Sequence, residues 1–350
     1  MSGRLELRRG VVVGEDPLTI ELDGERRPAW ADESLLGEMR EGDEVVVNVA
    51  ALDLGLGSGG FDVVHVNLTR GLGPRGGRGE EHVMKLNYTS LQHPVNPVEL
   101  PLSLPPGKDG KGAAERSGRA IPVLILPLHG HLAPAAWATA QAKPGARVGY
   151  VQTAGGALPG SFGRDVVALR ERDLLAGHLT AAPTYGGEHE ALSVIGALDA
   201  AAGNLGWDAA IVGPGPGIIG SETRFGHGGM AAVDNAHASL ALGMRTFLSP
   251  RLSAADARDR HRGVSHHTLT VLRVLLAGVE VPVPSGEPVA IAHLAEAAGW
   301  RHKLRQAPAD LAGYTHAGLP ARTMGRDLVD DPLFFAAALA AGTCLGAALG

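Results

Sequence analysis

The stretch "RHRGVSHHTL" carries the densest candidate chemistry, because His266 and His267 are adjacent and His261 lies just upstream. Imidazoles exchange protons near neutral pH and are common metal ligands. Ser265 precedes apolar residues at helical spacing, so we predict that it is the N-cap of a helix beginning at His266. Two interpretations stay open: histidines that carry chemistry, and histidines that only accompany a helix start. A serine nucleophile beside its own histidine base is disfavoured, because neighbours in sequence point apart on a helix.

A second pair, His129 and His131, follows the apolar segment 121–127. This H-x-H spacing after a strand occurs at metal sites, but two ligands do not complete one. Four further residues could complete it if their loop folded over the same edge: Asp256, Asp259, His261 and His266. The identity of a metal or any other cofactor stays undetermined.

A third candidate is the long loop 214–229, "PGPGIIGSETRFGHGG". Its glycines would let an anion approach backbone N–H groups, and Arg224 could hold a carboxylate or phosphate with two hydrogen bonds. Its prolines lack N–H donors, and the loop matches neither GxGxxG nor the P-loop pattern. Anion binding and a simple turn are therefore equally open for this loop, while turns are favoured for the glycine loops 153–161 and 184–189.

The elements that position these residues change character along the chain. Up to about residue 70, short extended segments are separated by turn signals such as Asp23-Gly24, which is typical of a small β-barrel of SH3 or OB type. We predict this barrel over residues 1–92, with its last strand at 85–92. A proline- and glycine-rich linker is predicted over 93–120, and its segment 107–119 is expected to be mobile and protease-sensitive.

From Ile121 to the C-terminus, apolar strand candidates alternate with helical segments. This alternation predicts a doubly wound, mainly parallel α/β domain over 121–350. Ligands of such sheets bind at the carboxyl ends of the strands, and most polar residues of interest follow predicted strands. The predicted catalytic residues are His129, His131 and His266. The predicted ligand-binding residues are Thr153, Gly155, Gly156, Tyr185, Ser221, Thr223, Arg224, His227, Arg262 and Ser265.

Composition narrows the choice of partners and compartment. The net charge of −6 and an aromatic content of 4% disfavour a nucleic-acid-binding protein. The N-terminus lacks the apolar core of a signal peptide, and the uncharged segment 333–349 is shorter than the roughly 20 residues of a spanning helix. We therefore expect a buried helix there and a cytoplasmic protein without a membrane partner. The single Cys344 excludes an intrachain disulfide, and a homo-oligomer is compatible with the sequence.

Five long stretches carry a resemblance to a known family: "NVAALDLGLGSGGFDVV", "HVMKLNYTSLQ", "GPGPGIIGSETRFGHGGM", "RHRGVSHHTLT" and "TMGRDLVDDPLFF". In these stretches, and over nearly the whole chain, the sequence resembles the uncharacterised bacterial domain of unknown function family 3866. The resemblance implies a bacterial protein. It brings no known activity, so it assigns no catalytic residue.

Two functions are compatible with these patterns. The first is an enzyme, a hydrolase or group transferase, that binds a small anionic substrate or cofactor at the carboxyl edge of the sheet. The alternative is a non-catalytic ligand-binding or assembly protein that uses the barrel as an interaction module. The first function predicts that His129, Thr153, Tyr185, Arg224 and His266 share one rim, with at least three of them around one pocket.

Overall fold

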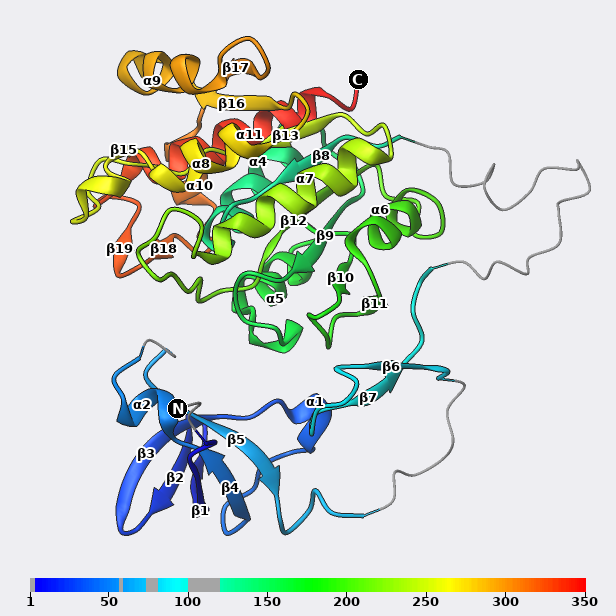
Figure 1. Cartoon of the computed structure of the whole chain (residues 1–350), viewed down its shortest axis with the longest axis vertical. Helices are drawn as coiled ribbons and strands as arrows, with labels where there is room; N and C mark the ends of the chain where they lie inside the picture. The colour runs from blue at the N-terminus through cyan, green and yellow to red at the C-terminus, as the bar shows by residue number, and fades with distance from the viewer. Residues whose placement is uncertain (1–3, 57–58, 74–80, 100–119) are drawn as a thin grey trace, which may run out of the picture. The chain divides into compact units, whose positions relative to one another are not determined.

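The computed structural model describes residues 4–56, 59–73, 81–99 and 120–350 (Figure 1). The chain divides into two compact units, Met1–Glu81 and His82–Gly350. Each unit has its own hydrophobic core, and each is described by itself below.

The first unit is a closed five-stranded barrel with the strand order β1-β2-β3-β5-β4. The β3–β5 pair is parallel and the other pairs are antiparallel, which is a Greek-key arrangement of the OB type. The predicted turn at Asp23-Gly24 joins β2 to β3, and both residues have positive φ. The predicted barrel is therefore confirmed. Its strands are Leu7–Glu15, Leu18–Leu22, Glu25–Trp30, Glu44–Asn48 and Asp62–Asn67, and its short helices are α1 (Glu33–Leu36) and α2 (Ala50–Asp53).

The strand predicted over 85–92 is wrong, because only Lys85 of this stretch is in a strand. Strand β6 (Val83–Lys85) pairs with β7 (His93–Val95), and the residues between them form turns. The Lys85 side chain is 2% exposed, and its Nζ donates to the carbonyl oxygens of Thr180 at 2.8 Å and Thr184 at 2.7 Å and pairs with Glu190. These contacts attach the β6–β7 hairpin to the rest of the second unit.

The boundary between the units therefore differs from the predicted one at residue 92. Val98, which belongs to the predicted linker, donates its N–H to the carbonyl oxygen of Glu190 at 2.8 Å. Residues 100–119 of that linker, including the segment 107–119 that we expected to be mobile, lie outside the described residues.

The second unit contains an eight-stranded sheet with the order β11-β10-β9-β12-β8-β13-β16-β17. All of its pairings are parallel, which confirms the predicted parallel sheet. In chain order the strands are Val123–Ile125 (β8), Val148–Thr153 (β9), His178–Ala181 (β10), His189–Ala191 (β11), Ala209–Pro214 (β12), Thr246–Leu248 (β13), Glu280–Pro284 (β16) and Lys303–Ala307 (β17).

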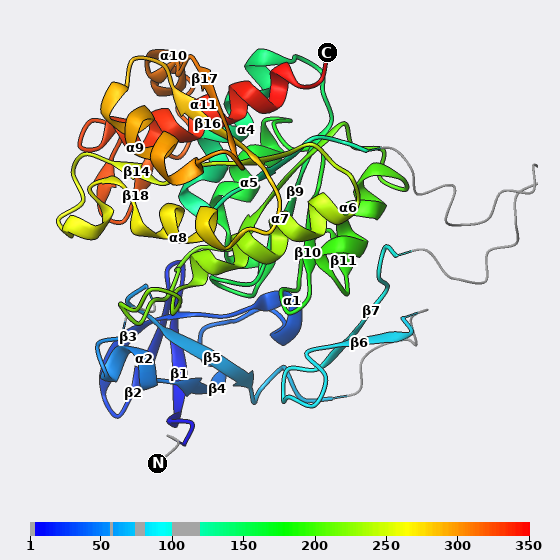
Figure 2. The ribbon, with the colours of Figure 1, turned by 45° about the horizontal axis from the view of Figure 1, so that its top comes forward.

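Helices cover both faces of this sheet. Successive residues of each buried strand point to opposite faces, so each strand contributes side chains to both layers. Leu124 of β8 belongs to one core cluster, and its neighbours Val123 and Ile125 belong to the other. The face of Leu124 is covered by α4 (Leu132–Ala142), α5 (Arg164–Glu171), α10 (Leu311–His316) and α11 (Pro332–Ala347). The opposite face is covered by α6 (Val194–Ala202), α7 (Ala231–Ala241), α8 (His266–Val274) and α9 (Pro288–Ala298); Figure 2 shows α8, α7 and α6 along it. The doubly wound prediction is confirmed.

Helix α11 is the apolar C-terminal segment, and it is buried as predicted. It packs closely on α4, because a Cβ added at Gly342 would lie 2.2 Å from the carbonyl oxygen of Ala135. Within the described ranges, no helix has both the length and the apolar character needed to cross a membrane.

The substitution Lys85→Met tests the role of the β6–β7 hairpin. It leaves Glu190 and two backbone carbonyls without their buried cation, so we expect the free energy of unfolding to fall by about 3 kcal/mol. Urea denaturation followed by circular dichroism measures this change. Lys303→Met, at an exposed position of β17, is the matched control and should change stability by less than about 0.5 kcal/mol. Equal effects of the two substitutions would contradict the assigned role of Lys85.

Candidate functional site

The sheet has a topological switch point at β8. The chain leaves the carboxyl end of β8 toward α4, on one face of the sheet. It leaves the two neighbouring strands, β12 and β13, toward α7 and α8 on the opposite face. Open α/β sheets commonly bind their ligands at the strand ends beside such a switch point.

The segment between β13 and α8 folds back on itself at this edge. Strands β14 (Leu252–Ser253) and β15 (Gly263–Val264) pair in antiparallel fashion, with the 3-10 turn Asp259–His261 between them. Ser265 follows β15 and is the N-cap of α8, because its Oγ accepts the backbone N–H of His267 at 3.2 Å. The predicted N-cap is confirmed. The same Oγ lies 2.7 Å from Nδ1 of His261, which brings this imidazole beside the first turn of α8.

Four imidazoles meet at this point, and we call them the histidine cluster: His227, His261, His266 and His267. The ring of His261 lies 4.9 Å from that of His266 and 4.7 Å from that of His267, measured between centroids. His227 arrives from the loop after β12 and stacks on His267 at 3.5 Å with an interplanar angle of 6°. The cluster therefore joins residues from the loops of the two strands that flank β8.

Most of the cluster is shielded from water. His227, His261 and His267 are 8%, 1% and 9% exposed, whereas His266 is partly exposed. His266 is therefore the member of the cluster with the most contact with solvent. Both ring nitrogens of His227 and Nε2 of His266 are buried without a hydrogen-bond partner among the described residues.

The surroundings keep these imidazoles neutral. Burial, together with the charge of Arg251, lowers the pKa of His261 to about 3. Burial and the stacked His227 lower the pKa of His267 to about 2, and burial also lowers the pKa values of His227 and His266. A neutral imidazole keeps one nitrogen lone pair, which can accept a proton or bind a metal ion.

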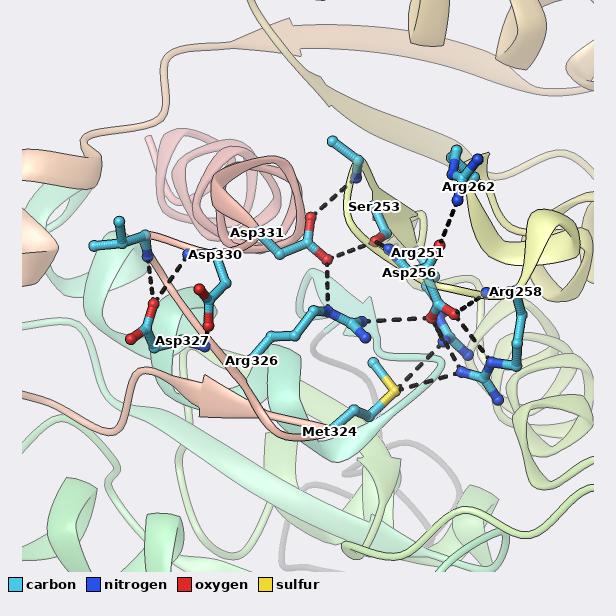
Figure 3. A network of polar contacts seen from close by, with 12 residues as sticks. Arg251, Ser253, Asp256, Arg258, Arg262, Met324, Arg326, Asp327, Asp330 and Asp331 are labelled. Atoms are coloured by element: carbon cyan, nitrogen blue, oxygen red, sulfur yellow. Dashed lines mark hydrogen bonds and ion pairs between the residues drawn. The ribbon is translucent and has the colours of Figure 1, made fainter.

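A buried network of charges holds the loop that carries His261 (Figure 3). The Asp256 carboxylate is 1% exposed and accepts hydrogen bonds from Arg251 at 3.0 Å and from two nitrogens of Arg258 at 3.0 Å each. Arg326 reaches the same carboxylate at 3.4 Å. Burial lowers the pKa of Arg251 to about 10, so this guanidinium stays protonated at neutral pH.

The network continues to the start of α11. Asp331 accepts hydrogen bonds from Ser253 Oγ at 2.5 Å and from the backbone N–H of Ala254 at 3.0 Å. Arg326, which lies on the small hairpin of β18 (Arg322–Thr323) and β19 (Arg326–Asp327), donates to Asp331 at 3.2 Å. The carboxylates of Asp256 and Asp331 thus connect the β14–β15 hairpin to the β18–β19 hairpin and to the start of α11.

The structure brings three of the predicted site residues together: His227, Ser265 and His266. His129 and His131 lie in other surroundings. They belong to the short 3-10 helix His129–His131, on which their side chains point in different directions. Nε2 of His129 lies 3.7 Å from Asp165 on α5. Nδ1 of His131 lies 2.9 Å from Ser249 Oγ, and its ring packs 4.6 Å from that of Phe334.

The predicted glycine loops pack on each other. A Cβ added at Gly155 would lie 2.4 Å from the carbonyl oxygen of Gly228, and one added at Gly156 would lie 2.0 Å from that of Gly215. These glycines therefore serve the close approach of two backbone segments, which agrees with the favoured turn interpretation of the loop 153–161.

Two predicted ligand-binding side chains at this edge are buried. Thr153 Oγ1 accepts a hydrogen bond from Asn235 at 2.9 Å. Tyr185 is 4% exposed, and its ring lies 5.2 Å from that of His93.

The polar tip of the long loop faces solvent. The hydroxyl groups of Ser221 and Thr223 hydrogen-bond to each other at 3.0 Å, and the exposed Arg224 lies over the ring of Phe225 at 4.8 Å. Arg262 is also exposed, and its nearest carboxylate is that of Asp259 at 3.4 Å. The arginine that joins the two loops is Arg260, which pairs with Glu222 at 3.0 Å.

Several residues of the site were not among the predicted catalytic or ligand-binding residues, among them His267, Arg251 and Arg260. His261 and Asp256 were predicted only as possible additions to a metal site at His129 and His131. The spacing of His261, His266 and His267 was visible in the sequence, but their meeting depends on the β14–β15 hairpin. Arg251 lies just after β13. A single buried arginine in a loop leaves no periodic pattern in the sequence.

Comparison with known proteins places this arrangement in a family. A family model described as "Protein of unknown function (DUF3866)" matches residues 28–342. The chain belongs to the DUF3866 family. The matched region of this DUF3866 protein includes the whole histidine cluster and the Asp256 network. No curated protein and no solved structure matches the chain.

The substitution Asp256→Asn tests the charge network. It leaves the buried Arg251 without its counter-charge, so we expect the free energy of unfolding at pH 7 to fall by about 3 kcal/mol or more. Thermal and urea denaturation measure the change. Asp259→Asn removes the same charge three residues away, at a side chain that is 94% exposed, and should have little effect. A small loss in the first variant would show that the network does not hold the loop.

The same pair of variants has a defined pH dependence. Burial alone raises the pKa of Asp256, but the hydrogen bonds and charge of Arg258 and the charge of Arg251 outweigh it and hold the pKa well below its usual range. The ionised carboxylate therefore contributes its stability above about pH 4, and this contribution is lost progressively as the pH falls further. The stability difference between wild type and Asp256→Asn should shrink below pH 4; a constant difference would contradict this assignment.

Proposed function

We propose that this DUF3866 protein is an enzyme, a hydrolase or group transferase, with its active site at the histidine cluster and a small anionic substrate. The observation that carries the proposal is the meeting of four neutral imidazoles, several of them with unpartnered ring nitrogens, at the switch point of the sheet. A buried nitrogen without a partner costs free energy, so such a group indicates a ligand or a chemical role.

The cluster assigns different roles to its members. A general base works best when its pKa lies near the operating pH, which disfavours His261 and His267. Their lone pairs are suited to holding a ligand. His266 is the partly exposed member, so it is the imidazole that a substrate meets first.

The charge around His266 supports an anionic substrate. Arg260, Arg251 and Arg258 all contribute positive potential at this imidazole, and together they help to lower its pKa after the effect of burial. Arg260 is 35% exposed and lies where the two loops meet, so it can contact a small molecule at the cluster. A guanidinium binds phosphate or carboxylate oxygens with paired hydrogen bonds.

The proposal also includes a bacterial source and a location in the cytoplasm. A bacterial, cytoplasmic enzyme with a small-molecule substrate agrees with the net charge of −6 and the single cysteine. The acidic balance disfavours nucleic acid as a substrate.

Anion binding is tested with inorganic phosphate and pyrophosphate as probes. Both anions should raise the midpoint of thermal unfolding of the wild-type protein, and Arg260→Gln should weaken their binding about 10-fold, since one charge-assisted contact is lost. Arg273→Gln, an equal charge change at an exposed position of α8, and Arg224→Gln should leave the affinity within about twofold. Loss of binding in Arg224→Gln but not in Arg260→Gln would move the anion site to the tip of the long loop.

Catalysis is tested with p-nitrophenyl phosphate, bis(p-nitrophenyl) phosphate and p-nitrophenyl acetate. We expect turnover of at least one of them, and a loss of about 100-fold or more in His266→Gln. Exposed His293→Gln is the matched control. Phosphate binding at the cluster without turnover of any probe would favour the alternative, a non-catalytic ligand-binding protein.

A further inference from the structure

Three members of the cluster have ring nitrogens that lie close to one another. One ligand atom each from His261, His266 and His267 lies within 4.8 Å of the other two. Nε2 of His266 is buried and makes no hydrogen bond to any described residue. The unpartnered nitrogen of His266 lies near ring nitrogens of His261 and His267, and a bound cation would contact one nitrogen of each residue.

We propose that His261, His266 and His267 bind one divalent transition-metal ion of the zinc type, with a fourth coordination position open. Three imidazoles form a donor set that suits such ions, and sites with three protein ligands keep a position for water or substrate. In a tetrahedral site with Zn–N bonds of about 2.05 Å, the nitrogens are separated by about 3.4 Å. Metal binding would therefore draw nitrogens that are now up to 4.8 Å apart closer together.

The neighbour of His261 fits the way metal-binding histidines are oriented. Such a histidine donates its second ring N–H to a fixed acceptor, which leaves the other nitrogen for the metal. Ser265 Oγ lies 2.7 Å from Nδ1 of His261, and the Ser265 side chain is held in place as the N-cap of α8. Donation from Nδ1–H to this oxygen leaves the lone pair on Nε2 of His261.

The fourth member of the cluster, His227, is not a ligand in the proposed metal site. Its ring is stacked face to face on His267, so a metal in the plane of the His267 ring cannot lie in the plane of the His227 ring as well. His227 therefore flanks the site, and its unpartnered nitrogens are available to a water or substrate beside the metal.

The charges around the site determine which kind of ligand the open coordination position binds. Neutral imidazoles do not cancel the two positive charges of the ion, and Arg251, Arg258 and Arg260 add positive potential. Asp256 offsets part of that potential through its pairing with Arg251 and Arg258. The arginines weaken cation binding, but the combined charge of metal and arginines favours an anionic oxygen at the fourth position. This consequence rests on the proposed function, whereas the metal site itself does not.

The test is titration of the full-length protein with zinc after removal of metals with EDTA and dialysis. Isothermal titration calorimetry should give one ion per chain, and Co²⁺ should give the visible absorption of a four-coordinate site. His261→Ala, His266→Ala and His267→Ala should each weaken zinc binding about 100-fold or more, because each removes a ligand. Exposed His293→Ala, outside the cluster, should bind zinc like wild type.

The controls separate loss of the site from loss of the fold. His266 is the least buried ligand, so His266→Gln should keep the wild-type circular dichroism spectrum while zinc binding falls. Wild-type protein that takes up no zinc or Co²⁺, or a His266→Gln variant that binds zinc as tightly as wild type, would overturn the proposal.

The outcome is distinguishable from failure of the proposed function. Zinc binding without turnover of any phosphate or acetate ester would support the metal site and contradict the enzyme. Turnover that continues in metal-free protein with EDTA present, together with no zinc binding, would support the enzyme and contradict the metal site.

Discussion

The buried carboxylate of Asp256 is the interaction on which the candidate site depends. Asp256 is 1% exposed and is surrounded by Arg251, Arg258 and Arg326. A lone buried charge would be strongly unfavourable, but here each ion has a partner with good geometry. The result is a loop of fixed shape between β13 and α8, and that shape decides where His261 lies relative to the first turn of α8.

The network and the histidine cluster depend on each other through charge. Arg251 holds the loop by its pairing with Asp256, and its positive charge also helps to keep His261 unprotonated. Burial has the larger effect on the imidazole, since water is excluded from the space between the loops. A site of neutral imidazoles beside protonated guanidinium groups follows, in which lone pairs and anion-binding groups lie close together.

The glycines of the neighbouring loops allow two loop backbones to pack against each other. Gly155 and Gly228 let the loops after β9 and β12 approach each other more closely than any side chain would permit. This contact fixes the 3-10 turn Gly228–Met230 that leads into α7, and His227 lies directly before that turn. The polar tip at Ser221–Arg224 is left in solvent, so the loop contributes to the site through its C-terminal end and not through its most polar residues.

The sequence by itself determined the barrel, the parallel sheet covered on both faces and the edge on which the histidines gather, because turn signals and apolar periodicity are local properties. It also determined Ser265 as the N-cap of α8, since capping involves neighbouring residues only. Tertiary structure alone decided which histidines meet. His129 and His131 follow the same strand edge, yet alternation on a 3-10 helix turns them toward Asp165 and Ser249. His261 reaches His267 only because a two-residue strand pair and a buried arginine network fold the chain back, and neither leaves a periodic pattern in the sequence.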